Sequence, residues 1–318
     1  MTEPGAVSAV AGDHLVRSPA AGAPVSDGRR RMTLNGWATV AVFLPPALLV
    51  FTVFVFLPVV EAGWYGFFNW DGYGRPEKIV GLKNYEWLFS NPAFQRALVN
   101  NGLIIAVSLL VQLPLALGVA VLIAGRMRGA VVFRLIFFLP YVLADVAAGL
   151  IWRFMLDGSY GIPSLFTDML GLQPFYLLAS KDWAFSAVLI VTVWKYFGFH
   201  MMLYIAGLQG IDKEVLEAAK MDGACPWQRF RHITLPLLGP MIRLSIFFSV
   251  IGALKFFDMI VPLTGGGPFN TTHTMVSFLY YFGLTRMRIG FGSAVGVVLF
   301  VICVTFAFGY QRLVMRDD

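Results

Sequence analysis

The stretch from Leu98 to Ile123 reads LVNNGLIIAVSLLVQLPLALGVAVLI and contains no Asp, Glu, Lys or Arg. About 20 consecutive, mostly apolar residues match a hydrocarbon core roughly 30 Å thick. Because lipid cannot hydrogen-bond the backbone, a spanning segment of this kind must be a helix. The strands of a transmembrane barrel would alternate over about ten residues, and this stretch shows no such alternation. The stretch therefore predicts a membrane-spanning helix.

Five further apolar runs extend this prediction to an all-α membrane protein with six transmembrane helices. They lie at about Trp37–Val60, Val131–Met155, Trp183–Leu208, Met241–Leu263 and Phe291–Tyr310. We expect residues 36–318 to form one transmembrane domain. Residues 1–35 are rich in Ala, Gly, Pro and Ser, and this composition predicts a disordered tail.

Composition agrees with a membrane protein and excludes several other classes. The 318 residues are 58% hydrophobic and 13% charged, which is too little charge for an ordinary soluble domain. We attribute the net charge of +6 to loop Lys and Arg that orient the helices, and we expect no nucleic-acid partner. Six spans put both termini on one side, and the segments on that side carry more Lys and Arg, which predicts cytoplasmic termini. Cys225, Cys303 and four scattered histidines predict neither a disulfide nor a metal site.

The segment between the fourth and fifth predicted spans is long and polar. Residues 209–236 read QGIDKEVLEAAKMDGACPWQRFRHITLP. Asp212 can cap a helix, Gly223 can end it in a left-handed conformation, and Pro226 suits the first turn of a second helix. The pattern predicts a helix–Gly–helix hairpin, at about 209–239, with alanines on its exposed face. Such a hairpin suits either docking against another protein or an amphipathic position on the lipid surface.

Several short motifs in this chain occur together in one protein family. Glu217-Ala218-Ala219, Asp222-Gly223-Ala224 and Ile233-x-Leu235-Pro236 resemble the signature loop of binding-protein-dependent ABC permeases. Other motifs are similar to those of the sugar permeases of this family, typified by the maltose and glycerol-phosphate importers, and follow the expected order. They are Gly81-Leu-Lys-Asn-Tyr85, Phe138-Leu-Pro140, Trp152-Arg153, Trp194-Lys195, Phe257-Asp258 and Leu263-Thr-Gly-Gly-Gly-Pro268.

This resemblance implies the transmembrane domain of a type I ABC importer in a bacterial inner membrane. The hairpin would sit in a groove on a separate ATPase, and ATP-driven closure of two such ATPases would switch the pore between its inward- and outward-facing states. The ATPase-coupling residues would be Glu217, Ala218, Ala219, Asp222, Gly223 and Ala224. An extracytoplasmic binding protein would deliver a mono- or oligosaccharide, and a second, related permease chain would complete the pore in the lipid bilayer.

The chain is expected to be a transport subunit and not an enzyme. It contains no Gly-x-x-x-x-Gly-Lys-Ser/Thr loop that could hold ATP phosphates, so we expect ATP and Mg²⁺ on the partner ATPase and no cofactor on this chain.

Ionisable and aromatic residues in the apolar runs are candidates for a sugar pathway. Lys255 and Asp258 are three residues apart, so on a helix they would share one face and could pair. Aromatic faces stack on sugar rings, which adds Trp194, Tyr196 and Phe257, and Lys195 lies between the first two. The ionisable residues could instead form a structural ion pair or extend their long side chains to the membrane interface. The aromatic residues could instead face lipid. His200 is interpreted as a packing residue.

Three other functions remain open from the sequence. An ion-gradient-driven secondary transporter often shows inverted repeats and broken helices, and no convincing repeat is visible. An intramembrane enzyme needs a catalytic constellation, and no evident one exists in the spans. An ABC importer of glycerol 3-phosphate or of another non-sugar solute would share the hairpin.

Overall fold

The computed structural model describes residues 34–124 and 129–315. The chain divides into two compact units, with the boundary between Thr52 and Val53. The described part of the first unit consists of α1 (Leu34–Phe51), which contains Pro45 and Pro46, and the first residue of the following π-helical turn. The predicted tail lies outside the described residues except for Leu34 and Asn35, which belong to α1.

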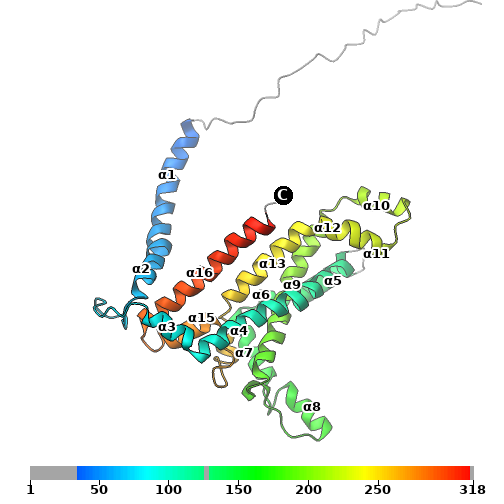
Figure 1. Cartoon of the computed structure of the whole chain (residues 1–318). Helices are drawn as coiled ribbons and strands as arrows, with labels where there is room; N and C mark the ends of the chain where they lie inside the picture. Colours follow the sequence, from blue (N-terminus) through cyan, green and yellow to red (C-terminus); the bar gives the residue numbers. More distant parts are fainter. Residues whose placement is uncertain (1–33, 125–128, 316–318) are drawn as a thin grey trace, which may run out of the picture. The chain divides into compact units, whose positions relative to one another are not determined.

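The second unit is helical (Figure 1), and no β-strand is named in the described ranges, where Phe68 and Ile79 form an isolated bridge. The prediction of an all-α fold is therefore confirmed. The α-helices are α2 (Leu57–Tyr65), α3 (Lys83–Ser90), α4 (Pro92–Val107), α5 (Leu113–Ala124), α6 (Ala130–Val142), α7 (Asp145–Met155), α8 (Ile162–Leu170), α9 (Ala184–Gln209), α10 (Lys213–Met221), α11 (Pro226–Arg229), α12 (Leu235–Leu237), α13 (Gly239–Leu254), α14 (Ile260–Leu263), α15 (Met275–Phe278) and α16 (Ile289–Val314).

Four helical stretches are long and apolar enough to cross a membrane. They are Thr39–Tyr65, Pro92–Ala124, Ala184–Gln209 and Ile289–Val314. Two bent pairs reach that length only together: Ala130–Val142 with Asp145–Met155, bent by 97°, and Pro226–Leu237 with Gly239–Leu254, bent by 64°. By length and composition, the described ranges thus hold four candidate spans, or up to six if each pair is one span. The count of six remains a prediction.

Two predicted spans differ from the structure. The expected continuous helix Val131–Met155 is broken at Leu143 and Ala144, whose ψ angles are 142° and 138°. The expected span Met241–Leu263 leaves the helix after Leu254. The placement of Lys255 and Asp258 on one helical face is therefore wrong, and no ion pair joins them in the part of the chain that the structure describes.

Three π-helical turns interrupt the long helices, each at the same distance from a proline. They are η1 (Thr52–Phe56), η2 (Ser108–Gln112) and η4 (Phe230–Thr234), and Pro58, Pro114 and Pro236 follow two residues after their ends. Proline has no N–H, and its ring collides with the carbonyl four residues earlier. That carbonyl lies inside the π turn in each case, so the wider turn accommodates the proline without ending the helix. The last π turn, η5 (Leu279–Leu284), has no such proline.

Three apolar clusters form the core of the second unit. The first joins α3, α4, α13, α15, η5 and α16, with Phe94, Phe278 and Phe291 at its centre. The second surrounds Val188 of α9 and Ile260 of α14. The third packs α5 against α9 around Met201, and Figure 1 shows these two helices side by side. Helix α9 contributes to two of the three clusters and is the central element of this unit.

Helices α6 and α9 approach closely at Gly198. A Cβ atom at this position would lie 2.0 Å from the carbonyl oxygen of Phe137. Only glycine leaves room for that contact, because a real Cβ does not approach a heavy atom within 3.0 Å. This close approach places Lys195, one turn earlier on α9, beside the C-terminal end of α6.

Candidate functional site

The polar hairpin between α9 and α13 is built by local sequence signals. The carboxylate of Asp212 accepts a hydrogen bond from the backbone N–H of Glu214 (3.0 Å) and caps α10. Gly223 ends the helix at φ +80°. The N–H of Ala224 donates to the carbonyl of Ala219 (3.0 Å), and that of Gly223 to Lys220 (3.1 Å), which is the Schellman pattern of helix ends. The predicted helix–Gly–helix geometry is therefore observed.

The second half of the hairpin starts at Cys225. Its backbone N–H donates to Oε1 of Gln228 (2.8 Å), and Pro226 occupies the first turn of α11. The rings of Trp227 and Phe230 lie 5.7 Å apart. A groove of about 430 Å³ runs beside the turn and is lined by Asp222, Gly223, Ala224, Gln228, His232 and Ile233.

Exposure on the hairpin differs from the expectation at one alanine. Ala218 is exposed, whereas Ala219 is buried. Glu217, Asp222 and Gly223 are exposed, and Ala224 is partly buried. Large apolar side chains are exposed next to these charges, among them Met221 (87%) and Trp227 (64%). Met221 was not predicted from the sequence, because a single methionine beside a turn carries no periodic signal.

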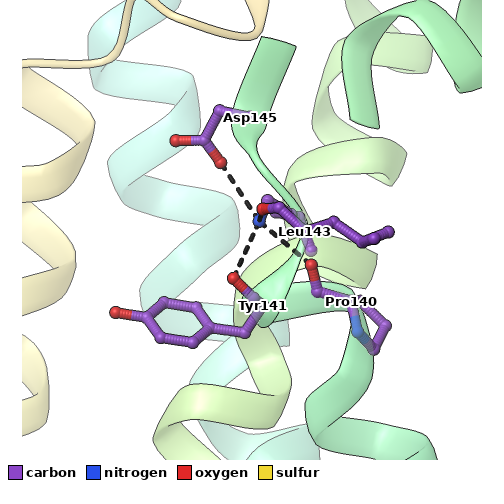
Figure 2. A network of polar contacts seen from close by, with 5 residues as sticks. Pro140, Tyr141, Leu143 and Asp145 are labelled. Atoms are coloured by element: carbon purple, nitrogen blue, oxygen red, sulfur yellow. Dashed lines mark hydrogen bonds and ion pairs between the residues drawn. The ribbon is translucent and has the colours of Figure 1, made fainter. Parts of the chain in front are cut away.

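A second constellation lies where the α6–α7 span is broken (Figure 2). Lys195 of α9 is 1% exposed. Its Nζ donates to the carbonyl oxygens of Pro140 (3.0 Å), Tyr141 (2.9 Å) and Leu143, and lies 3.2 Å from Oδ1 of Asp145. A lysine ammonium has three donors. All its hydrogen-bonding capacity is therefore occupied by these acceptors.

The electrostatics of this contact match both helix ends. The last carbonyls of a helix lack intrahelical partners and carry partial negative charge, whereas the first turn favours an anion. Lys195 supplies the cation to the end of α6, and Asp145 supplies the anion to the start of α7. The ammonium also lies 5.7 Å and 5.6 Å from the ring centroids of Tyr141 and Tyr196. We call Lys195 with these partners the lysine clamp. It explains how protein groups stabilise the break in α6–α7.

Beside the lysine clamp, helices α4–η2, α9 and α13 enclose a cavity of about 380 Å³ that is open on one side. Its aromatic walls include Tyr196, Phe199 and Phe256. Its polar lining consists of Ser108, Gln112, Tyr141, Thr192, Tyr196, His200 and Ser249. The volume lies in the lower part of the range of roughly 300–1,000 Å³ for small-molecule sites.

The polar groups of this cavity differ in how they are paired. Nδ1 of His200 lies 2.5 Å from the hydroxyl of Ser245, and Thr192 donates to the carbonyl of Val188 (2.7 Å). The hydroxyl of Ser108 donates to Oε1 of Gln112 (3.5 Å). The hydroxyl of Ser249 is buried and has no hydrogen-bond partner within the described ranges. Buried polar groups are almost always paired, so the hydroxyl of Ser249 differs in this respect from the other polar groups of the cavity.

The predicted pathway residues are only partly brought together. Tyr196 lines the cavity, but Trp194 packs against Trp152 (ring centroids 5.2 Å apart). Phe257 packs against Tyr280 (5.3 Å). Lys255 and Asp258 are exposed and do not line the cavity, and their predicted role in the pathway stays a prediction.

Ser108, Gln112 and Ser249 line the cavity and were not predicted from the sequence. Ser108 and Gln112 are two of the four polar residues in the apolar stretch quoted first, besides Asn100 and Asn101, and their spacing of four positions puts them on one side of a helix. This spacing is a signal that could have identified two of the three.

The comparisons with known proteins agree with the helical architecture. Residues 113–317 match a family model described as "Binding-protein-dependent transport system inner membrane component". The chain is 34% identical over 292 residues to the diacetylchitobiose uptake system permease protein NgcF of Streptomyces coelicolor, covering 88% of this chain and 83% of that protein. It is 35% identical over 269 residues to the trehalose/maltose transport system permease protein MalF of Thermococcus litoralis, covering 84% and 90% respectively.

A solved structure shares the fold. A chain from a bacterial ABC transporter "involved in the import of the acidic polysaccharide alginate" superposes with a TM-score of 0.78 at 23% identity. The match covers 89% of this chain and 97% of the other. At this level of identity the match establishes the architecture and not the cargo.

Proposed function

This chain belongs to the family of binding-protein-dependent transport system inner membrane components, and we propose that it is the channel-forming permease subunit of an ATP-driven sugar importer. The relatives named above are permeases of sugar uptake systems, of diacetylchitobiose in one case and of trehalose and maltose in the other. A shared ancestry across more than four-fifths of the chain supports a related cargo class. The cargo would be a mono- or oligosaccharide.

The hairpin α10–Gly223–α11 is the proposed contact with an ABC ATPase. The observation that carries this proposal is the exposure of Glu217, Met221 and Trp227 on a hairpin whose fold is fixed by its own cap and turn. Charged and aromatic side chains on a preorganised element lose little entropy on docking. ATP and Mg²⁺ would be bound by the partner, because this chain has no phosphate-binding loop.

The complete importer would contain further chains. We propose a second, related permease, two ATPase subunits and an extracytoplasmic binding protein that delivers the sugar. The termini and the hairpin would face the cytoplasm of a bacterial inner membrane, as the distribution of Lys and Arg favours. The cavity between α4–η2, α9 and α13 would form part of the sugar pathway, with its open side completed by the second permease.

The test of this proposal is sugar uptake into proteoliposomes that contain the complete transporter. Uptake should require ATP and should persist when ion gradients are collapsed. Uptake that follows an ion gradient and ignores ATP would contradict the proposal and support a secondary transporter.

Gly223 gives a sharper test of coupling. A valine at φ +80° is strained, because β-branched residues avoid the left-handed region. Nothing lies within 4 Å of a Cβ built there, so the strain comes from the backbone alone. Gly223→Val should lose most of the cargo-stimulated ATPase activity while the protein still inserts in the membrane.

The matched control is Gly223→Asn, since asparagine tolerates the left-handed conformation. It should retain most of the coupling. Equal coupling in the valine, asparagine and wild-type proteins would show that this turn does not transmit ATP hydrolysis.

A further inference from the structure

The segment that connects α7 to α9 precedes a candidate span and carries helix α8 (Ile162–Leu170). Helix α9 is long and apolar enough to cross a membrane, and the hairpin follows its C-terminal end. Helix α8 comes before its N-terminal end, and Figure 1 shows α8 and α10 at opposite ends of the second unit. By its place in the chain, α8 therefore belongs to the membrane surface at which α9 begins.

Helix α8 is amphipathic, and its apolar side faces away from the protein. At about 100° per residue, its aliphatic and aromatic side chains fall within an arc of about 140°. They are Ile162, Leu165, Phe166, Met169 and Leu170. The last four are 61–84% exposed, whereas Ser164 and Thr167, on the opposite side, are buried. A surface helix of a soluble protein has the reverse arrangement, with its apolar stripe toward the core.

Contacts within the segment itself fix the fold of α8. The hydroxyl of Ser164 donates to the carbonyl of Gly161 (2.8 Å), and that of Thr167 donates to the carbonyl of Ser164 (3.0 Å). Gly171 ends the helix at φ +63°, and the N–H of Leu172 donates to the carbonyl of Thr167 (2.8 Å). The apolar face therefore has a preformed shape, and the buried hydroxyls behind it are already paired.

The residues around α8 favour lipid as its partner. Residues 154–180 contain no Lys or Arg, and their acidic residues are Asp157 and Asp168. Exposed aromatic residues with a polar edge flank the helix on both sides, namely Tyr160, Tyr176 and Trp183. Tyr and Trp gather at the level where a membrane meets water. An apolar face without cations is held by the burial of apolar area and not by anionic headgroups.

We propose that α8 is an interfacial helix that lies in the plane of the membrane surface, with Leu165, Phe166, Met169 and Leu170 among the lipid acyl chains. Helices of this kind bury their apolar face about 5–10 Å into the boundary between headgroups and acyl chains. Exposed apolar patches mark contact with a partner or a membrane, and lipid is the medium of the neighbouring span. The helix would hold the connection between α7 and α9 at the bilayer surface.

The experiment measures what surrounds the apolar face in the complete transporter, reconstituted in phosphatidylcholine nanodiscs without the binding protein. Cys225 and Cys303 are replaced by serine, and a nitroxide is attached to Met169→Cys. Electron paramagnetic resonance then gives its collision rates with oxygen, which dissolves in lipid, and with a nickel chelate, which stays in water. The oxygen-to-nickel ratio should be several-fold higher than for a nitroxide on Asp168→Cys, the matched control on the polar side of α8.

Three outcomes would overturn the inference. Equal ratios at the two positions, with frequent nickel collisions, would place the apolar face in water. Rare collisions of the Met169→Cys label with both reagents would show that another protein chain covers it. A difference that appears only after anionic lipid is added would mean that headgroup charge, and not apolar burial, holds the helix.

A second variant tests whether the apolar face itself holds α8 in lipid. Phe166→Asp places a charge within this face and should bring the Met169→Cys label into water, whereas Asp168→Asn should leave its ratio unchanged. Within the described ranges no residue of α8 belongs to the three apolar clusters, so Phe166→Asp spares the core. An unchanged ratio in Phe166→Asp would contradict the inference.

This inference goes beyond the proposed function, because it depends neither on the cargo nor on ATP. ATP-dependent sugar uptake by a transporter whose Met169→Cys label lies in water would overturn the inference and leave the importer assignment intact. A label in lipid on a protein whose uptake follows an ion gradient and ignores ATP would overturn only the proposed function.

Discussion

Lys195 illustrates how a single residue can make a broken helix tolerable in an apolar environment. The break at Leu143 and Ala144 leaves the last carbonyls of α6 without intrahelical partners. In lipid, each unpaired group of this kind costs several kcal/mol. Lys195 pairs with two of these carbonyls, with the carbonyl of Leu143 in the break and with Asp145, so one buried cation satisfies both sides of the break. Each partner is therefore costly to remove alone.

Removal of the cation at the lysine clamp should be strongly destabilising. Lys195→Met has nearly the same length, but it leaves three carbonyls and Asp145 unpaired. We expect a loss of about 3–5 kcal/mol in the free energy of unfolding, as for other broken buried pairs. Thermal denaturation of the purified protein, monitored by size-exclusion chromatography, measures the loss of stability.

The double variant Lys195→Met/Asp145→Asn is the control for this prediction. It removes the uncompensated carboxylate and should recover part of the stability that Lys195→Met loses. A Lys195→Met protein as stable as the wild type would show that the ammonium group contributes no net stability.

The packing of α6 against α9 depends on how closely the two helices approach. Lys195 reaches the end of α6 because Gly198 brings the two backbones together, at a point where a Cβ would lie 2.0 Å from the carbonyl oxygen of Phe137. The neighbouring rings of Phe137 and Phe197 pack edge to face, with centroids 5.6 Å apart. The lysine clamp is thus a consequence of helix packing and not of a local motif.

Gly198→Ala should separate these two helices. The added methyl group meets backbone and not a flexible side chain, so the helices must shift, at a cost of about 1–3 kcal/mol in the free energy of unfolding. Gly118→Ala in α5 is the matched control, because no atom lies within 4 Å of its Cβ position. It should be neutral or stabilising by up to about 1 kcal/mol. Equal melting temperatures for the two variants would contradict the close approach.

In the second unit as a whole, α4 holds together segments that are distant in the sequence. Nδ2 of Asn100 donates to the carbonyls of Thr271 (2.7 Å) and His273 (2.8 Å). Nδ2 of Asn101 donates to the carbonyl of Ala253 (2.6 Å), and its Oδ1 accepts from the N–H of Met275 (2.9 Å). These contacts fix the connection between α14 and α15 against α4. They also bury His273, which is 2% exposed.

The burial of His273 predicts a pH dependence of stability. Burial, followed by the nearby Arg286, lowers the pKa of His273 to about 4 from its ordinary 6.5. Below pH 6.5 the unfolded chain therefore binds a proton that the folded chain does not. The contribution of His273 should fall progressively from pH 6.5 to pH 4, by about 3 kcal/mol in total.

Chemical denaturation at a series of pH values measures this change. His273→Gln retains a polar side chain that does not titrate in this range, so its stability should change less with pH than that of the wild type. Identical pH profiles for the two proteins would contradict a depressed pKa in the folded state.

The sequence alone determined the features that depend on composition and on local signals. Long runs without charge allow only helices in lipid, and Asp212, Gly223 and Pro226 specify the hairpin because a cap, a left-handed turn and an N-terminal proline act within a few residues. The motifs of the hairpin also indicate the family, because they are contiguous in the chain and can be read without knowledge of any contact between helices.

Only the tertiary structure decided which groups meet across helices. The run Val131–Met155 does not by itself show that the helix breaks at Leu143 and Ala144, because the break is stabilised by a lysine more than 50 residues away. The helix that was expected to carry Lys255 and Asp258 ends at Leu254, where the carbonyl of Ala253 is bonded to Asn101 of α4. Hydrophobic periodicity reports which segments are buried, but it carries no record of the partner that each buried polar group finds. The lysine clamp and the cavity beside it are products of such pairings, and for this reason they emerged only from the folded chain.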